Sequence, residues 1–233
     1  MTTPNTPNPS TLIVFPLYPN LTQLDFTGPF QFLSRLPGAR TIIASAQGGE
    51  IEAEGGMVFG RTTKLSDIAA CDIICVPGGF AATDAALDAD FLPHVRRLAL
   101  GARYITSVCT GSLILGAAGL LQGRRAACHW AWRHLLTEFG AIPDPGRVVR
   151  DGNIFTGGGV TAGIDFALTL VAEIAGDDFA QGLQLGLEYA PAPPFDAGRP
   201  ETAPPAILAA YEARMATLMP PRVAQARAAA AAM

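Results

Sequence analysis

Cys109 is the residue whose type and position best suit covalent chemistry. It directly follows a β-branched apolar run at 103–108, and the small residues Gly111 and Ser112 come next, where a helix is expected to begin. A strand that turns sharply into a helix projects the residue at the turn above the carboxyl end of a sheet. The helix N-terminus behind such a residue lowers the pKa of a thiol. We therefore predict that Cys109 is a nucleophilic thiolate rather than a buried core cysteine.

Glycine-rich turns follow two further apolar runs of the chain. Gly78 and Gly79 come after the run at 72–76, and Gly159 and Val160 come after the run at 153–156. Glycines permit positive φ and let backbone N–H groups approach a ligand closely. Gly78 and Gly79 are therefore candidate oxyanion donors opposite Cys109, and the second turn is a candidate wall of the same pocket. Taken alone, most turns of this kind are simply tight turns.

A nucleophilic thiol needs a proton partner, and Asp25 is the candidate. It stands between Leu24 and Phe26, an unusual place for a carboxylate unless it meets a polar group. The spacing leaves two interpretations open, an acid/base residue and a capping or turn aspartate ahead of Gly28. In apolar surroundings its pKa should be raised, which would favour the protonated form.

The other three cysteines are interpreted as packing residues. Cys71 and Cys75 flank a predicted buried strand with no histidine beside them, and Cys128 is followed by His129, for which a structural role is favoured. The spacings contain neither a CxxC pair nor a Cys/His zinc pattern. We expect free thiols, no metal and no cofactor.

The elements that must position these residues alternate between strands and helices. Apolar β-branched runs predict strands at 11–15, 39–46, 72–76, 103–108, 147–149 and 153–156. Helical periodicity is found at 21–36, 91–100, 111–121, 130–139 and 161–175. This alternation predicts βαβ units, and so one α/β domain with a mostly parallel sheet sandwiched between helices.

Composition divides the chain into three parts. Residues 1–10 are polar and proline-spaced, which predicts a flexible tail before a domain at 11–190. The composition of residues 191–233 predicts a proline-rich arm followed by an alanine-rich helix, packed on the domain or on a partner subunit. This arm and the apolar composition favour a homodimer.

Charge and hydropathy exclude several classes of protein. The 233 residues contain 16 Lys+Arg against 20 Asp+Glu, a net charge of −4, which disfavours nucleic-acid binding. Apolar residues make up 49% and charged residues 15%, against roughly 25% charged in an ordinary domain, so extensive burial is expected and disorder is excluded. With neither a signal peptide nor a membrane-spanning run in the sequence, we expect a cytoplasmic protein that does not bind membranes.

The motifs that carry these residues, taken together, resemble those of a known superfamily. VCTGS, PGG, LDFTGP, ACHW and GGGVTAGIDFAL together resemble the ThiJ/PfpI superfamily of cysteine-elbow proteins, with its class I glutamine-amidotransferase-like fold, and within it the isocyanide-hydrating members. The resemblance runs from about residue 12 to 205. It implies that Cys109 is the nucleophile, that Asp25 is the acid/base residue and that Thr110 helps to activate the thiol. Protease-like members have histidine where this chain has Thr110, and the hydratases are expected to have threonine where it has Cys128.

The resemblance implies a cofactor-independent lyase that adds water to a small-molecule isocyanide, R–N≡C, through a Cys109 thioimidate. The product would be an N-substituted formamide. The alternative is a ligand-sensing domain like the N-terminal half of AraC-type regulators. Beyond Pro205 the only cations are Arg214, Arg222 and Arg227, too few for a DNA-reading unit, so the enzyme is the favoured hypothesis.

Overall fold

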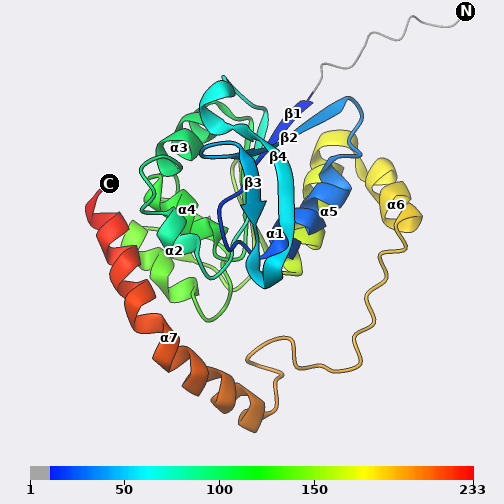
Figure 1. Ribbon diagram of the computed structural model, residues 1–233. Coiled ribbons are helices and arrows are strands. Elements are labelled where there is room, and N and C mark those ends of the chain that lie inside the picture. The colour runs from blue at the N-terminus through cyan, green and yellow to red at the C-terminus, as the bar shows by residue number, and fades with distance from the viewer. Residues whose placement is uncertain (1–10) are drawn as a thin grey trace, which may run out of the picture.

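An eight-stranded sheet forms the centre of the computed structural model, which describes residues 11–233 (Figure 1). Its order is β3-β4-β2-β1-β5-β6-β10-β9, and only the outer pairs β3–β4 and β10–β9 are antiparallel. The strands are β1 Thr11–Pro16, β2 Ala39–Ser45, β3 Gly49–Glu52, β4 Val58–Lys64, β5 Ile73–Val76, β6 Tyr104–Val108, β9 Val148–Asp151 and β10 Ile154–Gly157. A separate short pair joins β7 (Arg125–Ala126) to β8 (Ile142–Pro143). The tail predicted at 1–10 lies outside the described residues.

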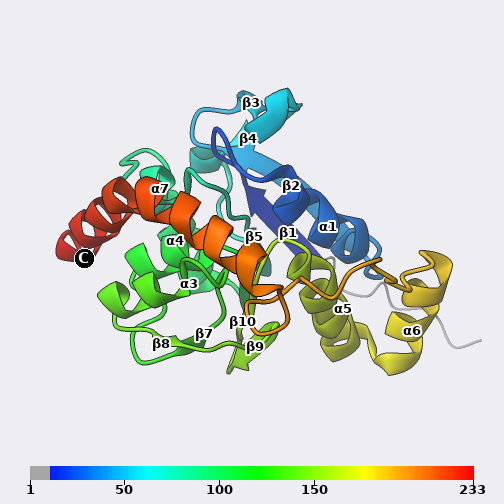
Figure 2. The ribbon, with the colours of Figure 1, turned by 90° about the horizontal axis from the view of Figure 1, so that it is seen from below.

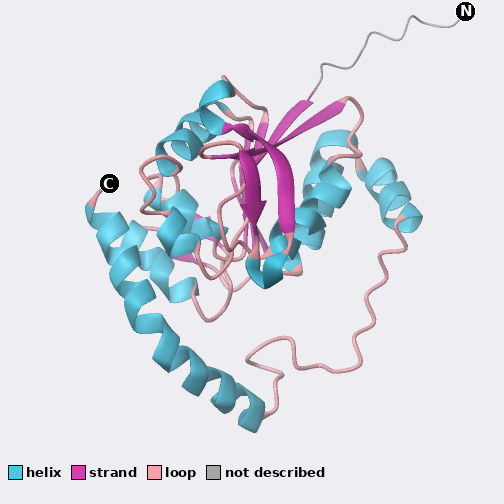
Figure 3. Cartoon of the chain, viewed as in Figure 1, coloured by secondary structure: helices cyan, strands magenta, loops and turns pink. Residues whose placement is uncertain are grey.

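Helices cover both faces of this sheet (Figure 3). One face carries α1 (Gln23–Leu33), α5 (Ala162–Ala175) and α6 (Asp177–Gly186). The other carries α2 (Ala82–Ala85), α3 (Leu92–Gly101), α4 (Gly111–Ala117) and α7 (Pro205–Ala231), with the 3₁₀ segment η3 (Arg133–Phe139). Two further 3₁₀ turns are η1 (Glu54–Gly56) and η2 (Leu65–Asp67). The predicted α/β architecture with a mostly parallel sheet is confirmed.

The differences from the predicted elements lie mainly in polar or irregular segments. The hairpin of β3 and β4 was not predicted, because β4 is largely exposed and contains no continuous apolar run. Helix α6 was also not predicted, since it begins with two aspartates and carries several polar residues. The helix predicted at 130–139 is instead the tighter 3₁₀ segment η3, and α4 stops at Ala117 rather than 121.

Three neighbouring parallel strands end at the same edge of the sheet. Val76 of β5 is in register with Ser107 of β6, and Val108 of β6 with Gly157 of β10. The turns that follow these strands therefore begin side by side. Strand β1 lies on the other side of β5 and leads into α1 at this same edge. This edge thus gathers the four segments that carry the predicted site residues.

Helix α7 packs on the domain of its own chain, against α2, α4 and η3. Arg222 forms an ion pair with Asp84, and Gln225 bonds both Asp84 and Thr83 of α2. The coil at 191–204 runs over an exposed path from α6 to α7, shown in orange in Figure 2. Within residues 11–233, no helix combines the length and the apolar character needed to cross a membrane.

Candidate active site

Cys109 lies at the turn between β6 and α4, as predicted. Its φ is 56°, in the left-handed region that non-glycine residues rarely adopt. The Cys109 N–H donates to the Gly157 carbonyl at 3.0 Å, and its carbonyl accepts from the Ser112 hydroxyl at 3.0 Å. The surrounding backbone therefore holds this conformation in place, a pattern that is frequent at functional sites.

The Asp25 carboxyl is fully buried in the first turn of α1. Its Oδ2 accepts the Gly78 N–H at 3.0 Å, across to the turn that follows β5. Its Oδ1 accepts no hydrogen bond of normal geometry. Thr22, not Asp25, is the N-cap of α1, so the interpretation of Asp25 as a capping or turn residue is not supported. The carboxyl instead leaves its own helix and enters the cluster around Cys109.

Thr110 joins the cysteine turn to the glycine turn after β5. Its Oγ1 accepts the Gly79 N–H at 2.8 Å and donates to the Gly79 carbonyl at 2.8 Å. Asp25 and Thr110 therefore occupy the N–H groups of Gly78 and Gly79, and a role of these glycines as oxyanion donors stays a prediction. In this structure the two glycines hold the Asp25 carboxyl and the Thr110 hydroxyl in place.

Steric crowding explains why this turn contains glycine. A Cβ on Gly78 would lie 2.6 Å from the Thr110 nitrogen and 2.7 Å from Asp25 Oδ2. Gly79 has φ of 150°, and a Cβ there would lie 2.6 Å from the Thr22 nitrogen. Glycine lets the backbone approach this closely, so the turn can lie directly against the other two segments.

Burial controls protonation in the cluster. It raises the pKa of Asp25 to about 7, against smaller lowering effects from the Gly78 N–H and the Cys109 thiol. Burial first, and then the Asp25 charge, raise the pKa of Cys109 well above its usual value of 9.0. The raised Asp25 pKa agrees with the sequence analysis. The prediction of a lowered thiol pKa is wrong, because the thiol is buried beside a carboxyl and α4 has only seven residues.

All four cysteines are buried free thiols. Burial raises the pKa of Cys71, Cys75 and Cys128 to about 12. Cys71 and Cys75 belong to the core, as predicted, but Cys128 also lines a cavity beside the cluster. Among residues 11–233, no group of three or more His, Cys, Asp or Glu side chains could hold a metal ion.

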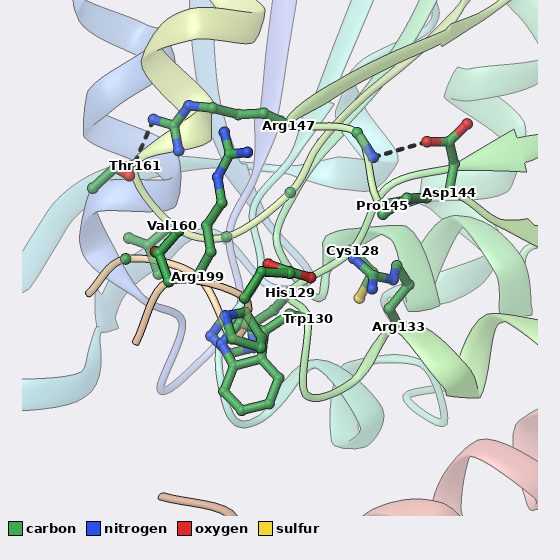
Figure 4. Close-up of a pocket in the computed structure, with 17 residues that line it drawn as sticks. Cys128, His129, Trp130, Arg133, Asp144, Pro145, Arg147, Val160, Thr161 and Arg199 are labelled. Carbon is green, nitrogen blue, oxygen red and sulfur yellow. Dashed lines mark hydrogen bonds between the residues drawn. The ribbon is translucent and has the colours of Figure 1, made fainter. Parts of the chain in front are cut away.

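The cavity has a volume of about 760 Å³ (Figure 4), and its wall includes Gly158, which directly follows Gly157, whose carbonyl accepts the Cys109 N–H. Gly159 and Val160, from the turn after β10, line this cavity together with Cys128 and His129, whereas Cys109, Asp25 and Thr110 are not among its lining residues. The His129 Nδ1 accepts the Ala131 N–H at 3.3 Å, and burial lowers the pKa of this histidine. His129 is therefore a neutral ring on the cavity wall.

Two tyrosines near the cluster were not identified from the sequence. Tyr18 follows β1 at the same sheet edge, is buried and donates its hydroxyl to the Pro77 carbonyl at 3.1 Å. Its pKa is raised by burial, then by Asp25 and Cys109. Tyr211 comes from α7 and packs on the Trp130 ring, with centroids 5.1 Å apart. The position of Tyr18 after a buried strand was an available signal, whereas the sequence has no signal that brings Tyr211 here.

The comparisons with known proteins agree with this fold. The DJ-1/PfpI family model matches residues 11–173, and the chain belongs to that family. It is 53% identical to the isonitrile hydratase of Pseudomonas putida, over 84% of this chain and 86% of the relative. A crystal structure of a ThiJ/PfpI family protein from Pseudomonas syringae matches with a TM-score of 0.89 and 38% identity, over 98% of this chain and 97% of that one. The HTH-type transcriptional regulator GlxA of Rhizobium meliloti is 34% identical over 58% of this chain and 42% of the regulator.

Proposed function

We propose that this protein is an isonitrile hydratase that converts an isocyanide and water into an N-substituted formamide. The observation that carries the proposal is the buried cluster of Cys109, Asp25 and Thr110 at the edge of the sheet, in a chain 53% identical to a named isonitrile hydratase. A thiol with a raised pKa beside a carboxyl whose pKa is about 7 suits a reaction that needs a nucleophile and a mobile proton.

In the first step, the Asp25 carboxylate accepts the proton of the Cys109 thiol. The sulfur then bonds to the terminal carbon of R–N≡C, and one carbon–nitrogen π pair moves to nitrogen. The carbon lone pair takes the proton back from Asp25, which gives the thioimidate R–N=CH–S–Cys109. This sequence makes Asp25 first a base and then an acid, and it needs no metal or cofactor.

In the second step, Asp25 removes a proton from a water molecule as the hydroxyl oxygen bonds to the thioimidate carbon. The nitrogen takes this proton from Asp25, and the carbon becomes tetrahedral. The C–S bond then breaks as the C=O bond forms, and the proton lost by the hydroxyl oxygen passes through Asp25 to the released sulfur. The products are R–NH–CHO and the original Cys109 thiol. Hydrogen bonding by the Thr110 backbone N–H, which favours a charged sulfur, supports the departure of the thiolate.

A ligand-sensing role like that of the AraC-type regulators is less well supported. The likeness to GlxA covers 58% of this chain at 34% identity, whereas the hydratase likeness covers 84% at 53%. A sensor requires only a binding pocket, and it does not require a buried carboxyl beside the thiol. The two hypotheses differ in whether bound ligand is consumed.

The direct test is to incubate the purified chain with cyclohexyl isocyanide and to measure the N-cyclohexylformamide formed. In ¹⁸O-labelled water, the label should enter the formyl oxygen, because water supplies that atom. Binding without turnover under conditions in which the chain is folded would favour the sensor. Homodimerisation and a cytoplasmic location remain predictions, and light scattering on the purified chain tests the first.

A further inference from the structure

The cavity beside the cysteine turn is lined by three arginines, Arg133, Arg147 and Arg199. They come from three separate segments, namely the start of η3, the loop before β9 and the coil before α7. This grouping stands out in a chain with a net charge of −4 and only 16 lysines and arginines. At about 760 Å³ the cavity falls in the range of small-molecule sites, about 300 to 1,000 Å³.

Two of these arginines lack an acidic partner. Arg147 pairs with Asp165 and bonds the Thr161 hydroxyl at 3.2 Å. Within residues 11–233, neither Arg133 nor Arg199 forms an ion pair.

The two acids on the cavity wall do not neutralise them. Asp144 uses one carboxylate oxygen for Arg125 and the other for the Gly146 N–H. Glu201, the second acid, makes no ion pair with any of the three arginines. The wall therefore keeps an excess of positive charge facing the cavity.

Figure 4 shows how the cations are arranged. The Arg199 side chain rises from the coil before α7, and its guanidinium points toward that of Arg147. Hydrogen bonds from Thr202 and Ala203 to the Arg199 carbonyl hold the backbone of this turn. Arg147 already has the Asp165 carboxylate as its partner, so Arg199 is the one of these two guanidinium groups that lines the cavity without an anion from the described part of the chain. The planar Arg199 group can offer two parallel N–H donors to such an anion.

We propose that the cavity selects isocyanides that carry a carboxylate, with the carboxylate held between Arg199 and Arg147. The inference rests on the proposed function, since it assigns the substrate class of the same site. The isocyano carbon would face the Cys109 turn, and Gly159, Val160 and Trp130 would enclose the connecting part of the substrate. The carboxylate would supply the anion that Arg199 lacks among residues 11–233.

The test compares isocyanoacetate and its longer-chain homologues, each beside its neutral methyl ester, with the purified full-length chain. For at least one chain length, kcat/KM for the acid should exceed that for its ester by about tenfold, and added NaCl should reduce this advantage. Arg199→Gln should lower kcat/KM for the acid by about tenfold, mainly through KM. It should leave kcat/KM for the ester within about twofold of the parent value. Arg199→Lys should keep part of the preference, because it keeps the charge.

Arg40→Gln is the matched control, because it removes one exposed arginine near the amino end of β2, at the opposite edge of the sheet. Arg40→Gln should leave kcat/KM unchanged for both the acid and its ester. The proposal is overturned if every ester is turned over as well as its acid, or if Arg199→Gln affects acids and esters equally.

A binding measurement separates this inference from the proposed function. Calorimetry on Cys109→Ala should detect N-formyl amino acids, such as N-formylglycine and its longer-chain homologues, and this binding should weaken with the additional Arg199→Gln change. If no isocyanide is hydrated but this Arg199-dependent binding remains, the proposed function fails and the anion site stands. If no N-formyl acid binds in preference to its ester, the anion site fails whatever the enzyme activity.

Discussion

The cysteine cluster and the cavity wall next to it are built in opposite ways. Cys109, Asp25 and Thr110 are buried, and the backbone N–H groups of the turn after β5 donate to the Asp25 and Thr110 side chains and hold them in place. The wall residues Arg147 and Arg199 come from loops and are exposed. The sheet therefore fixes the groups proposed for the reaction, while loops supply the groups that would select the substrate. Changes in the cluster should act on kcat, and changes in the wall should act on KM.

The largest effect is expected for Cys109→Ala. Loss of the nucleophile should reduce hydration by about ten-thousandfold or more, because the covalent path is removed. Cys75→Ala is the control, since Cys75 is a fully buried core thiol on the neighbouring strand and should affect stability more than rate. Formamide formation and thermal unfolding would be measured for both variants. Substantial turnover by folded Cys109→Ala would exclude the thioimidate.

Asp25→Asn should lower kcat by about 10² to 10⁴-fold, because an amide cannot move the proton in either step. Asp67→Asn, at an exposed position on η2, should leave kcat unchanged. In the parent, the rate should fall as the pH drops through about 7, since Asp25 is then protonated and cannot accept the thiol proton. Asp25→Asn should lose this limb of the pH profile. A folded variant with kcat within a few-fold of the parent at every pH would contradict the acid/base role.

The same carboxyl should make stability depend on pH. The folded pKa of about 7 lies above the ordinary value of 3.8, so stability due to Asp25 is full below about pH 4 and is lost as the pH rises through 7. Asp25→Asn should therefore unfold at higher temperature than the parent at pH 8 and lose this advantage near pH 4. Thermal melts at both pH values test whether burying the Asp25 carboxyl in the cluster lowers the stability of the folded chain.

Thr110→Val should have a smaller effect, about tenfold to a hundredfold on kcat. The change keeps the shape of the side chain but leaves both the N–H and the carbonyl of Gly79 without the Thr110 hydroxyl. A buried polar group without a partner costs about 1–3 kcal/mol, so the unfolding free energy should also fall. Thr110→Ser restores the hydroxyl and should recover most of the loss. If valine and serine behave alike, the hydroxyl does not position the glycine turn.

The comparison also separates what the sequence could predict from what it could not. The continuous apolar strands and the Cys109 turn were predictable, because buried parallel strands and a strand-to-helix turn leave local patterns. The partner of Asp25 was not, since 53 residues separate it from Gly78 and periodicity carries no information about such contacts. The use of the Gly79 N–H by Thr110, instead of by a ligand, depends on the same long-range packing.

The cavity wall was the least predictable part. Gly159 and Val160 could be placed there because they follow a predicted strand, but Arg199 lies in an irregular proline-rich coil. No periodic pattern relates that coil to the sheet edge. The raised pKa of Cys109 was likewise missed, because the extent of burial at the turn depends on segments distant in the sequence.

The smallest effect is expected for His129→Asn, which tests the wall against the cluster. His129 is neutral because burial lowers its pKa, and its Nδ1 only accepts the Ala131 N–H. The asparagine Oδ1 can take over that hydrogen bond, so kcat should stay within about threefold of the parent, and KM should carry most of any change. The loss of rate below pH 7 should remain, because it is attributed to Asp25. If His129→Asn still loses rate below pH 7 and changes only KM, His129 belongs to the cavity wall. Disappearance of the pH limb in His129→Asn would instead make the histidine the titrating group and move it into the proton path, contrary to the division between cluster and wall.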